Sequence, residues 1–281
     1  MTALIVTADD FGLAPEVNLA VEQAHRHGIL TAASLMVGAA AAGDAVARAK
    51  QLPGLRVGLH VVLVDGRPVL PPERVPDLVD ADGRFHDNMA MAGVGFFFGP
   101  AHRRQLAAEI EAQFQAYRAT GLALDHVNAH KHFHLHPTIA GSILRIGRRY
   151  GMRAMRVPFE PARLLKALEP VHGRPAAQLV APWAAFLRAR LRRQGVVVPD
   201  RVFGLAWSGA MTAKRLAALL NHLPTGSTEI YLHPATANVF SGSAPGYRHA
   251  EELAALTSPA VEAAAKASGA RLCGFADLAR A

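Results

Sequence analysis

Short apolar segments alternate with longer amphipathic segments along most of the chain. The apolar runs have the length of buried β-strands and are nearly continuous, as in a parallel sheet that is covered on both faces. They occupy residues 3–7, 33–37, 57–60, 123–128, 154–158, 202–205 and 229–233, with a weaker run at 271–275. The pattern therefore predicts a sheet of seven or eight parallel strands.

Helical patterns fill the intervals between these runs, at residues 17–27, 40–51, 105–120, 139–150, 212–223 and 248–266. Strand–helix alternation of this kind predicts an α/β fold, and so many units in 281 residues favour a distorted (β/α) barrel over an open sheet. No linker divides the chain, so we expect one domain over residues 1–281. Two long segments, near residues 61–100 and 160–199, exceed ordinary loops and are expected to be insertions on one rim of the barrel.

Composition narrows the class of protein without changing the predicted fold. Hydrophobic residues make up 51% of the chain, and the single Cys273 excludes an internal disulfide and a multi-cysteine zinc site. The formal net charge is +8, but no nucleic-acid recognition motif accompanies it, so we expect no nucleic-acid partner. The chain shows neither a secretory leader nor a run of about 20 apolar residues, so we expect a cytoplasmic protein that is at most peripheral to the membrane.

The most informative polar residues lie where the predicted strands end. In a parallel barrel the carboxyl ends of the strands meet on one face, where such folds build active sites. One polar residue at a strand end is ordinary, whereas six chemically matched ones from five strands are difficult to explain by packing. These residues are Asp9, Asp10, His60, His130, Arg156 and His233.

Asp9 and Asp10 follow the first predicted strand side by side. Adjacent residues on an extended strand point to opposite faces, so both can reach one site only if the chain turns there. Gly12 would help such a turn, and the two carboxylates would then have different roles. The alternative is structural, because Asp10 could simply cap the helix that begins near Pro15.

A histidine-rich segment at residues 126–137 favours the functional interpretation of this pair. It holds five histidines within eleven residues. Neutral imidazoles and carboxylates together form the usual ligand set of a divalent metal that keeps an open position for water. The alternatives are a buried structural role for His60 and a chance histidine tract. We expect the remaining histidines to be solvated: His25, His27, His86, His102, His172, His222 and His249.

His233 ends a strong β pattern without a second histidine close by, so it suits a general acid that protonates a leaving nitrogen. Arg156 ends the fifth predicted strand and could hold a carboxylate ionised, with a surface ion pair as the alternative. No competing chemistry is visible. A Gly-x-Ser-x-Gly elbow and a phosphate-binding glycine loop are absent, and Cys273 has no histidine partner in the sequence.

In order and spacing, these segments resemble the YdjC-like carbohydrate deacetylases over nearly the whole chain. The resemblance implies a distorted (β/α) barrel similar to polysaccharide deacetylases. It also implies a metal-dependent hydrolase that removes an acetyl group from the amide nitrogen of an amino sugar. The segments that carry it are Thr7-Ala8-Asp9-Asp10-Phe11-Gly12, Gly58-Leu59-His60, the histidine segment, Arg156-Val157-Pro158 and Leu232-His233-Pro234.

The resemblance also implies a role for each matched residue. Asp9 corresponds to the base that activates water, Arg156 to the residue that steadies it, and His233 to the acid. One divalent ion, zinc or magnesium, would have three ligands: Asp10, His60 and His130. The family usually has Asp-Ser-His where this chain has Asn128-Ala129-His130, which leaves the third ligand open among His130, His132 and His134.

Two apolar segments distinguish the chain from a deacetylase for small soluble sugars. Residues 89–99 form an apolar excursion. Residues 183–193 place apolar side chains on one side of a helix and mostly arginines on the other, as in a helix at a membrane interface: Trp183, Phe186, Leu187 and Leu191. Packing of both segments against the barrel is the alternative.

With these features the chain is most similar to the hopanoid-biosynthesis branch of the family. That similarity implies an N-acetylglucosaminyl lipid as substrate and contact with the inner face of the membrane. Two other functions stay open: a cytosolic deacetylase for chitooligosaccharides such as diacetylchitobiose, and a non-catalytic barrel that binds an acetylated sugar.

Overall fold

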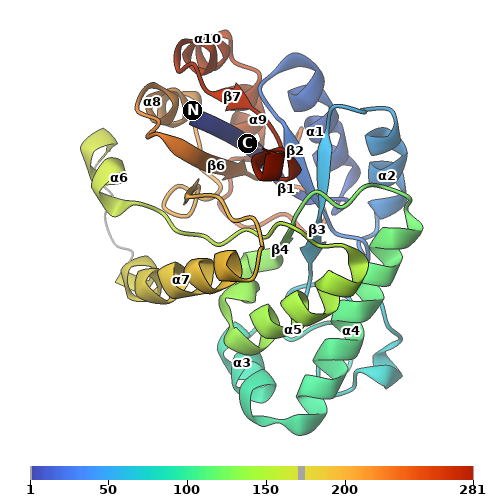
Figure 1. Cartoon of the computed structure of the whole chain (residues 1–281). Coiled ribbons are helices and arrows are strands. Elements are labelled where there is room, and N and C mark those ends of the chain that lie inside the picture. Colours follow the sequence, from blue (N-terminus) through green and yellow to red (C-terminus); the bar gives the residue numbers. More distant parts are fainter. Residues whose placement is uncertain (1, 170–174, 281) are drawn as a thin grey trace.

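In the part of the chain that the structure describes, seven parallel strands form one curled sheet at the centre of the protein (Figure 1). A computed structural model describes residues 2–169 and 175–280 of the chain. The strand order is β4-β3-β2-β1-β6-β5, and β7 pairs with β1. The strands are β1 (Thr2–Phe11), β2 (Ala32–Leu35), β3 (Arg56–Val61), β4 (Val127–Ala129), β5 (Arg201–Phe203), β6 (Gly226–Leu232) and β7 (Arg271–Leu272).

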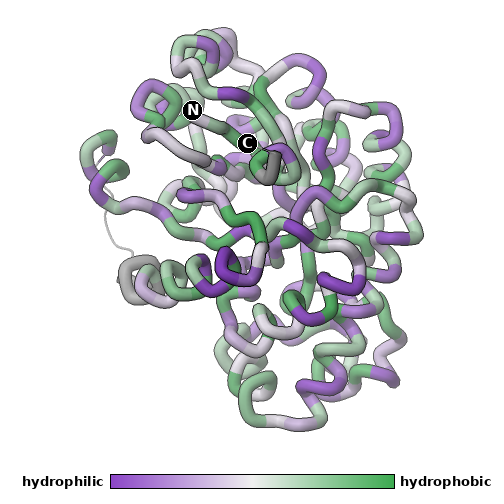
Figure 2. Tube along the Cα trace, in the orientation of Figure 1, coloured by the Kyte–Doolittle hydropathy of each residue, from purple (hydrophilic) through white to green (hydrophobic). Residues whose placement is uncertain are grey.

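Helices lie around the outside of the curled sheet, and its strands are largely buried except for β7, whose two residues are exposed (Figure 1). Figure 2 shows the corresponding hydropathy, with apolar residues along the central strands and polar stretches in the surrounding segments. The predicted α/β fold, a distorted (β/α) barrel with parallel strands, is confirmed. The α-helices are α1 (Pro15–His27), α2 (Ala42–Lys50), α3 (Met89–Phe98), α4 (Pro100–Ala119), α5 (Pro137–Gly147), α6 (Ala162–Leu168), α7 (Pro175–Arg193), α8 (Ala213–Asn221), α9 (His249–Leu256) and α10 (Pro259–Ala267).

The barrel is nearly closed by a segment that is not a regular strand. The sequence predicts a strand at residues 154–158, and these residues are buried as expected. Pro158 lacks an N–H group, so the segment cannot continue a full ladder of hydrogen bonds. The structure has two isolated parallel bridges there, which pair Ala154 with Val197 and Met155 with Val127.

Several predicted elements differ in extent from the observed ones, two of them clearly: a helix that is divided and a strand that is shifted and shortened. The helix predicted at residues 248–266 is divided into α9 and α10, because Pro259 begins a new helix after Thr257 and Ser258. The strand predicted at residues 123–128 is shortened to β4, which is followed at once by the 3₁₀-helix η2 (His130–Leu135).

The two predicted insertions contain helices of their own. Residues 61–100 hold α3 and the 3₁₀-helix η1 (Pro72–Arg74), and residues 160–199 hold α6 and α7. Residues 170–174 of the second insertion lie outside the described residues. In the part of the chain that the structure describes, no helix combines the length and the hydrophobicity needed to cross a membrane.

The apolar side of α7 packs against the barrel over most of its described length. Leu187 and Leu191 are 3% and 1% exposed. Trp183 Nε1 donates a hydrogen bond to the carbonyl oxygen of Leu135 at 2.7 Å. Phe186 is 53% exposed. The packing interpretation therefore accounts for α7 except at Phe186.

Candidate metal centre

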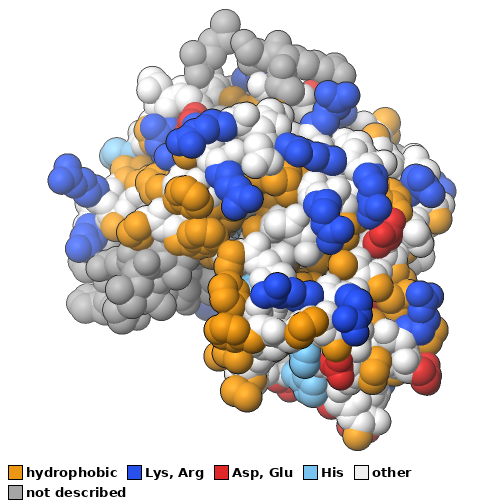
Figure 3. All heavy atoms as spheres, turned by 60° about the horizontal axis from the view of Figure 1, so that its bottom comes forward, with side chains coloured by type: hydrophobic (Ala, Val, Ile, Leu, Met, Phe, Trp, Pro, Cys, Tyr) orange, Lys and Arg blue, Asp and Glu red, His pale blue; other side chains and the backbone are white. Residues whose placement is uncertain are grey.

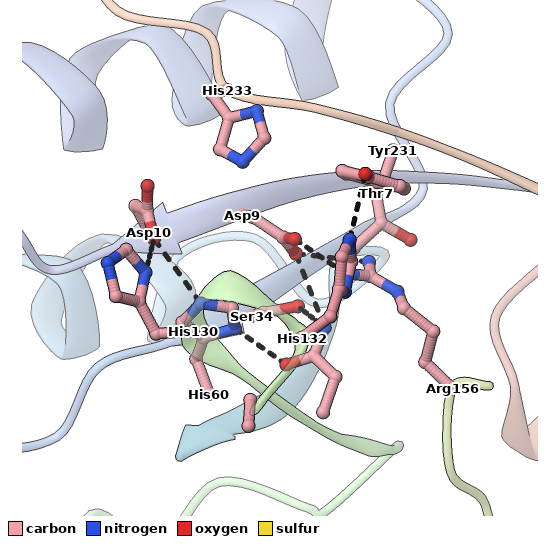
Figure 4. A network of polar contacts seen from close by, with 12 residues as sticks. Thr7, Asp9, Asp10, Ser34, His60, His130, His132, Arg156, Tyr231 and His233 are labelled. Carbon is pink, nitrogen blue, oxygen red and sulfur yellow. Dashed lines mark hydrogen bonds and ion pairs between the residues drawn. The ribbon is translucent and has the colours of Figure 1, made fainter. Parts of the chain in front are cut away.

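β1 carries both aspartates into one cavity because its backbone is irregular near its end. The pairing of β1 with β2 shifts register between Ala8 and Phe11, and Asp10 has a φ of 63°. This left-handed conformation is rare for residues other than glycine and is often found at functional sites. Asp9 and Asp10 consequently line the same cavity (Figure 4). Helix α1 is capped by Ala14 without a side-chain hydrogen bond, so the proposed capping role of Asp10 is wrong.

Asp10, His60 and His130 bring one ligand atom each within 4.8 Å of one another. Nε2 of His60 and Nδ1 of His130 lie 3.3 and 3.1 Å from the same oxygen, Asp10 Oδ1 (Figure 4). Burial opposes ionisation of Asp10, but the neighbouring His130 keeps the pKa of this carboxyl well below its usual value. Nε2 of His60 is buried and accepts or donates no hydrogen bond among the described residues. Two imidazoles and one carboxylate in this arrangement fit a divalent metal.

The other candidate third ligands have different partners. Nδ1 of His134 accepts a hydrogen bond from the backbone N–H of Ala129 at 3.0 Å, and burial lowers the pKa of His134 to about 3. Nε2 of His132 lies 2.8 Å from the hydroxyl of Tyr231. Lys131 and His132 have φ values of 51° and 54°, so the chain turns sharply after His130. Among the described residues, His130 is the member of the segment that joins Asp10 and His60.

Arg156 holds Asp9 from inside the barrel. Its Nη1 donates to Asp9 Oδ2 at 2.5 Å and its Nη2 to Asp9 Oδ1 at 3.0 Å. Its Nε and Nη2 also donate to Glu229 Oε1 at 2.9 and 2.6 Å. Burial alone would raise the pKa of Asp9, but Arg156 holds it far below its ordinary value. Arg156 is 0% exposed, so its interpretation as a surface ion pair is wrong.

His233 lies across the cavity from the histidine segment, above the two aspartates in Figure 4. Burial lowers the pKa of its imidazole, against the opposing effect of Asp10 and Asp9. Both backbone polar groups of His233 have hydrogen-bond partners. Its N–H donates to Glu252 Oε2 at 2.5 Å, and its carbonyl oxygen lies 2.6 Å from Nδ1 of His249.

The prediction that His249 is solvated is wrong. We expected it to be solvated, yet it is 4% exposed and packs against the aromatic rings of Phe240 and Tyr247. A buried histidine at the first position of a helix has the same sequence pattern as an exposed one, because its burial depends on which loop folds over it. His172, also expected to be solvated, lies outside the described residues.

The candidate site opens into a cavity of about 560 Å³, which is large enough for a sugar ring. All the strand-end residues that the sequence singles out line it except Arg156, which lies beneath Asp9. The cavity wall adds residues that no sequence argument indicated: Ser208, Tyr231, Ser243 and Tyr247.

Sequence reasoning also missed Glu229, Asn128 and Ser34. Glu229 is completely buried and accepts from Arg156 and from Thr7 Oγ1. A lone charge within the apolar run of β6 was the available signal, because a fully buried carboxylate requires a partner. The signal at Asn128 was its place in Asn128-Ala129-His130, where the family usually has Asp-Ser-His. Ser34 carries no comparable signal, since short polar residues in strands are common.

Fold and site together define a class of protein, a (β/α) barrel with a candidate metal centre at the carboxyl ends of its strands. Within that class, the chain belongs to the YdjC-like protein family, whose sequence profile matches residues 3–267.

Several known proteins are similar over most of their length. A carbohydrate deacetylase from Geobacillus stearothermophilus is 32% identical over 274 residues, which is 96% of either chain. A human carbohydrate deacetylase is 30% identical over 308 aligned residues, covering 98% of this chain and 90% of the relative. A crystal structure from Enterococcus faecalis V583, of a protein provisionally described as a cellobiose-phosphate cleavage protein, superposes with a TM-score of 0.76. It is 23% identical and covers 99% of this chain and 98% of its own, a likeness that establishes the fold alone.

Proposed function

We propose that the protein is a metal-dependent carbohydrate N-deacetylase. The observation that carries the proposal is the placement of an ionised carboxylate, Asp9, in the same cavity as a separate ligand group of Asp10, His60 and His130. A metal site needs the ligand group, whereas only a hydrolytic reaction needs the additional base. The relatives named carbohydrate deacetylases support the substrate class.

Each residue then has a defined task. Asp10, His60 and His130 would hold a divalent ion, which when bound acidifies water and polarises the amide carbonyl. Asp9 accepts the proton of the attacking water while the new bond to the acetyl carbon forms, and Arg156 keeps Asp9 ionised and oriented. His233 donates a proton to the nitrogen as the C–N bond breaks, which releases acetate and a free amine. Its pKa is lowered by burial, so its protonated form is a strong acid towards the leaving nitrogen.

Metal removal tests the proposed function directly. We expect the protein to release acetate from an N-acetylglucosaminyl substrate, to lose this activity after chelation, and to recover it better with zinc than with magnesium, which prefers oxygen ligands. His130→Ala should abolish metal binding, and His222→Ala, which changes an exposed histidine, should not. Acetate release that persists in protein shown to be metal-free would contradict the proposal. Sugar binding without acetate release would indicate a non-catalytic barrel.

An exposed apolar patch supports a lipid-linked substrate. On α3, Met91, Val94, Phe97 and Phe98 are 67%, 55%, 44% and 73% exposed. Figure 3 shows hydrophobic side chains gathered on this face, with Lys and Arg around them. Such a contiguous patch is unusual for a surface without a partner, whereas single exposed apolar residues are common.

The helix that carries the patch packs against the histidine segment that supplies His130. The ring of Phe96, on the inner side of α3, lies 5.6 Å from that of Phe133, which follows His130 in η2. We therefore propose an N-acetylglucosaminyl lipid of the hopanoid type as substrate, with α3 in contact with the inner face of the membrane while the amino sugar enters the cavity.

Liposome binding tests the membrane contact. We expect Phe97→Ser combined with Phe98→Ser to reduce sedimentation with anionic liposomes by about tenfold or more, because two interfacial phenylalanines are lost. Leu19→Ser, at an apolar residue of α1 that is 38% exposed, is the matched control and should bind as the unchanged protein does. Equal binding by the unsubstituted protein, the double phenylalanine variant and Leu19→Ser would contradict the proposed membrane contact. Faster acetate release from diacetylchitobiose than from the lipid would instead indicate a chitooligosaccharide deacetylase.

A further inference from the structure

A continuous chain of buried hydrogen bonds leads from His60 towards the other end of the barrel. Oδ1 of Asn128 lies 2.6 Å from Nδ1 of His60, and Nδ2 of Asn128 donates to Ser34 Oγ at 2.9 Å. Ser34 Oγ lies 3.0 Å from Nε2 of His126, whose Nδ1 lies 3.0 Å from Asp125 Oδ2. All five side chains are at most 5% exposed, so water cannot replace a missing partner easily.

Asp9 decides which way the amide of Asn128 points. Nδ2 of Asn128 also donates to Asp9 Oδ1 at 3.3 Å. If the amide were flipped, its oxygen would face the ionised carboxylate of Asp9, and two acceptors would be in contact. The oxygen of Asn128 therefore faces His60, and Nδ1 of His60 must carry the proton that it accepts.

The rest of the hydrogen-bond chain fits an arrangement in which every proton has an acceptor. Ser34 Oγ accepts from Asn128, and its own hydroxyl proton lies within reach of Nε2 of His126. In that arrangement His126 carries its proton on Nδ1 and donates it to Asp125. The other contacts of Asp125 are backbone N–H groups of Phe275 and Ala276, at 3.1 and 3.0 Å, which only an acceptor can satisfy.

The ring of His126 is also fixed in space. It stacks on Phe275 with ring centroids 4.2 Å apart. The ring also packs closely against the backbone of Gly58. A Cβ atom at this position would lie 2.5 Å from the ring, so only glycine fits there. From Asn128 to Asp125 the hydrogen-bond chain is therefore satisfied and the ring of His126 is held in place, which is the condition under which a buried polar network specifies one arrangement.

We propose that Asn128 is a positioning residue that holds His60 in the Nδ1–H tautomer, and that Ser34, His126 and Asp125 hold Asn128. The lone pair of Nε2 then points towards Asp10 Oδ1, where the ligand group converges. An amide suits this position because it accepts from His60 and donates to Asp9 at the same time, which neither a carboxylate nor a hydroxyl does while also serving Ser34. The inference rests on the metal-binding role proposed for His60.

Two substitutions at Asn128 separate positioning from packing. Asn128→Leu removes the acceptor for His60, and we expect the zinc affinity of the apoprotein to fall about 10–100-fold, the usual effect of losing the outer partner of a ligating histidine. Asn128→Asp keeps an acceptor for His60 but loses the donation to Asp9 and Ser34, so it should restore part of that affinity. Ser34→Ala should cause a smaller loss than Asn128→Leu, because Asp9 still orients the amide.

The readouts are zinc titration of the apoprotein against a chromophoric chelator and the visible absorption of the cobalt-substituted protein. Gln113→Leu is the matched control, since Gln113 is 2% exposed and hydrogen-bonded but does not belong to the chain of hydrogen bonds from His60 to Asp125. It should cost stability and leave zinc affinity unchanged. Unchanged affinity in Asn128→Leu, or an equal loss in Asn128→Asp, would overturn the inference. Failure of the unsubstituted protein to bind any divalent metal would overturn the proposed function instead.

Discussion

Asp9→Asn is expected to lower acetate release about 10²–10⁴-fold, the usual contribution of a general base, while zinc stays bound. The substitution removes the carboxylate proposed to accept the proton of water but leaves Asp10, His60 and His130 unchanged. Comparison of turnover and zinc content in the same preparation checks both parts of this expectation.

Asp65→Asn is the matched control for this experiment. Asp65 also lines the cavity, but its carboxylate is 44% exposed and pairs with Lys131 at 2.7 Å. Its substitution makes the same chemical change without touching Arg156 and should alter turnover little. If Asp9→Asn kept its zinc, stayed folded and lost less than tenfold in turnover, another group would have to be the base.

The strand-end residues were predictable because parallel strands impose a simple geometric rule. Every predicted strand that ends in a polar residue delivers it to one face, so Asp9, His60 and His233 could be expected to meet. The left-handed backbone conformation of Asp10 could not be predicted from the sequence in the same way. A φ of 63° in a non-glycine residue depends on the register shift against β2, which is a tertiary effect.

The partners of the site residues were less predictable than the residues themselves. Arg156 and Glu229 are 73 positions apart, and Asn128 and Ser34 are 94 apart, so only the order of strands brings them together.

The interpretation of α7 as a membrane helix also depends on tertiary structure. Its amphipathic pattern is real, but the same pattern describes a helix that packs on a barrel, and burial of Leu187 and Leu191 decides between them.

Arg156→Met is expected to be the most destabilising substitution in the site. The guanidinium serves Asp9 and Glu229 simultaneously and is 0% exposed. Its loss leaves two buried carboxylates without their cation, and breaking a buried pair in this way costs about 3–5 kcal/mol of the free energy of unfolding. Urea denaturation at pH 7 measures the loss. Arg149→Met is the control, since Arg149 pairs with Glu111 at 2.8 Å but is 55% exposed, and such surface pairs contribute about 0–1 kcal/mol.

The dependence of this loss on pH distinguishes charge pairing from lost packing. Arg156 holds the pKa of Asp9 below its unfolded value of 3.8, so the stability it provides is fully present above that value and is lost as pH falls through the folded pKa. The difference between Arg156→Met and the unsubstituted protein should therefore be largest at neutral pH and should shrink as pH approaches 4, where the buried and unpaired carboxylate of Asp9 in the variant is protonated. A difference that stays constant from pH 7 to pH 4 would mean that Arg156 stabilises the barrel by filling space.

Glu229→Gln in the Arg156→Met background completes the argument. If the cost comes from unpaired buried charge, removing one of the two carboxylates should recover part of the lost stability, although Glu229→Gln alone destabilises the protein by depriving Arg156 of an ionised partner. Turnover should not recover with it. Asp9 would still lack the two N–H donors that fix its orientation, so the double variant should be more stable than Arg156→Met and remain equally inactive. That outcome would mean that Arg156 stabilises the fold through both Asp9 and Glu229, whereas its effect on turnover runs through Asp9 alone.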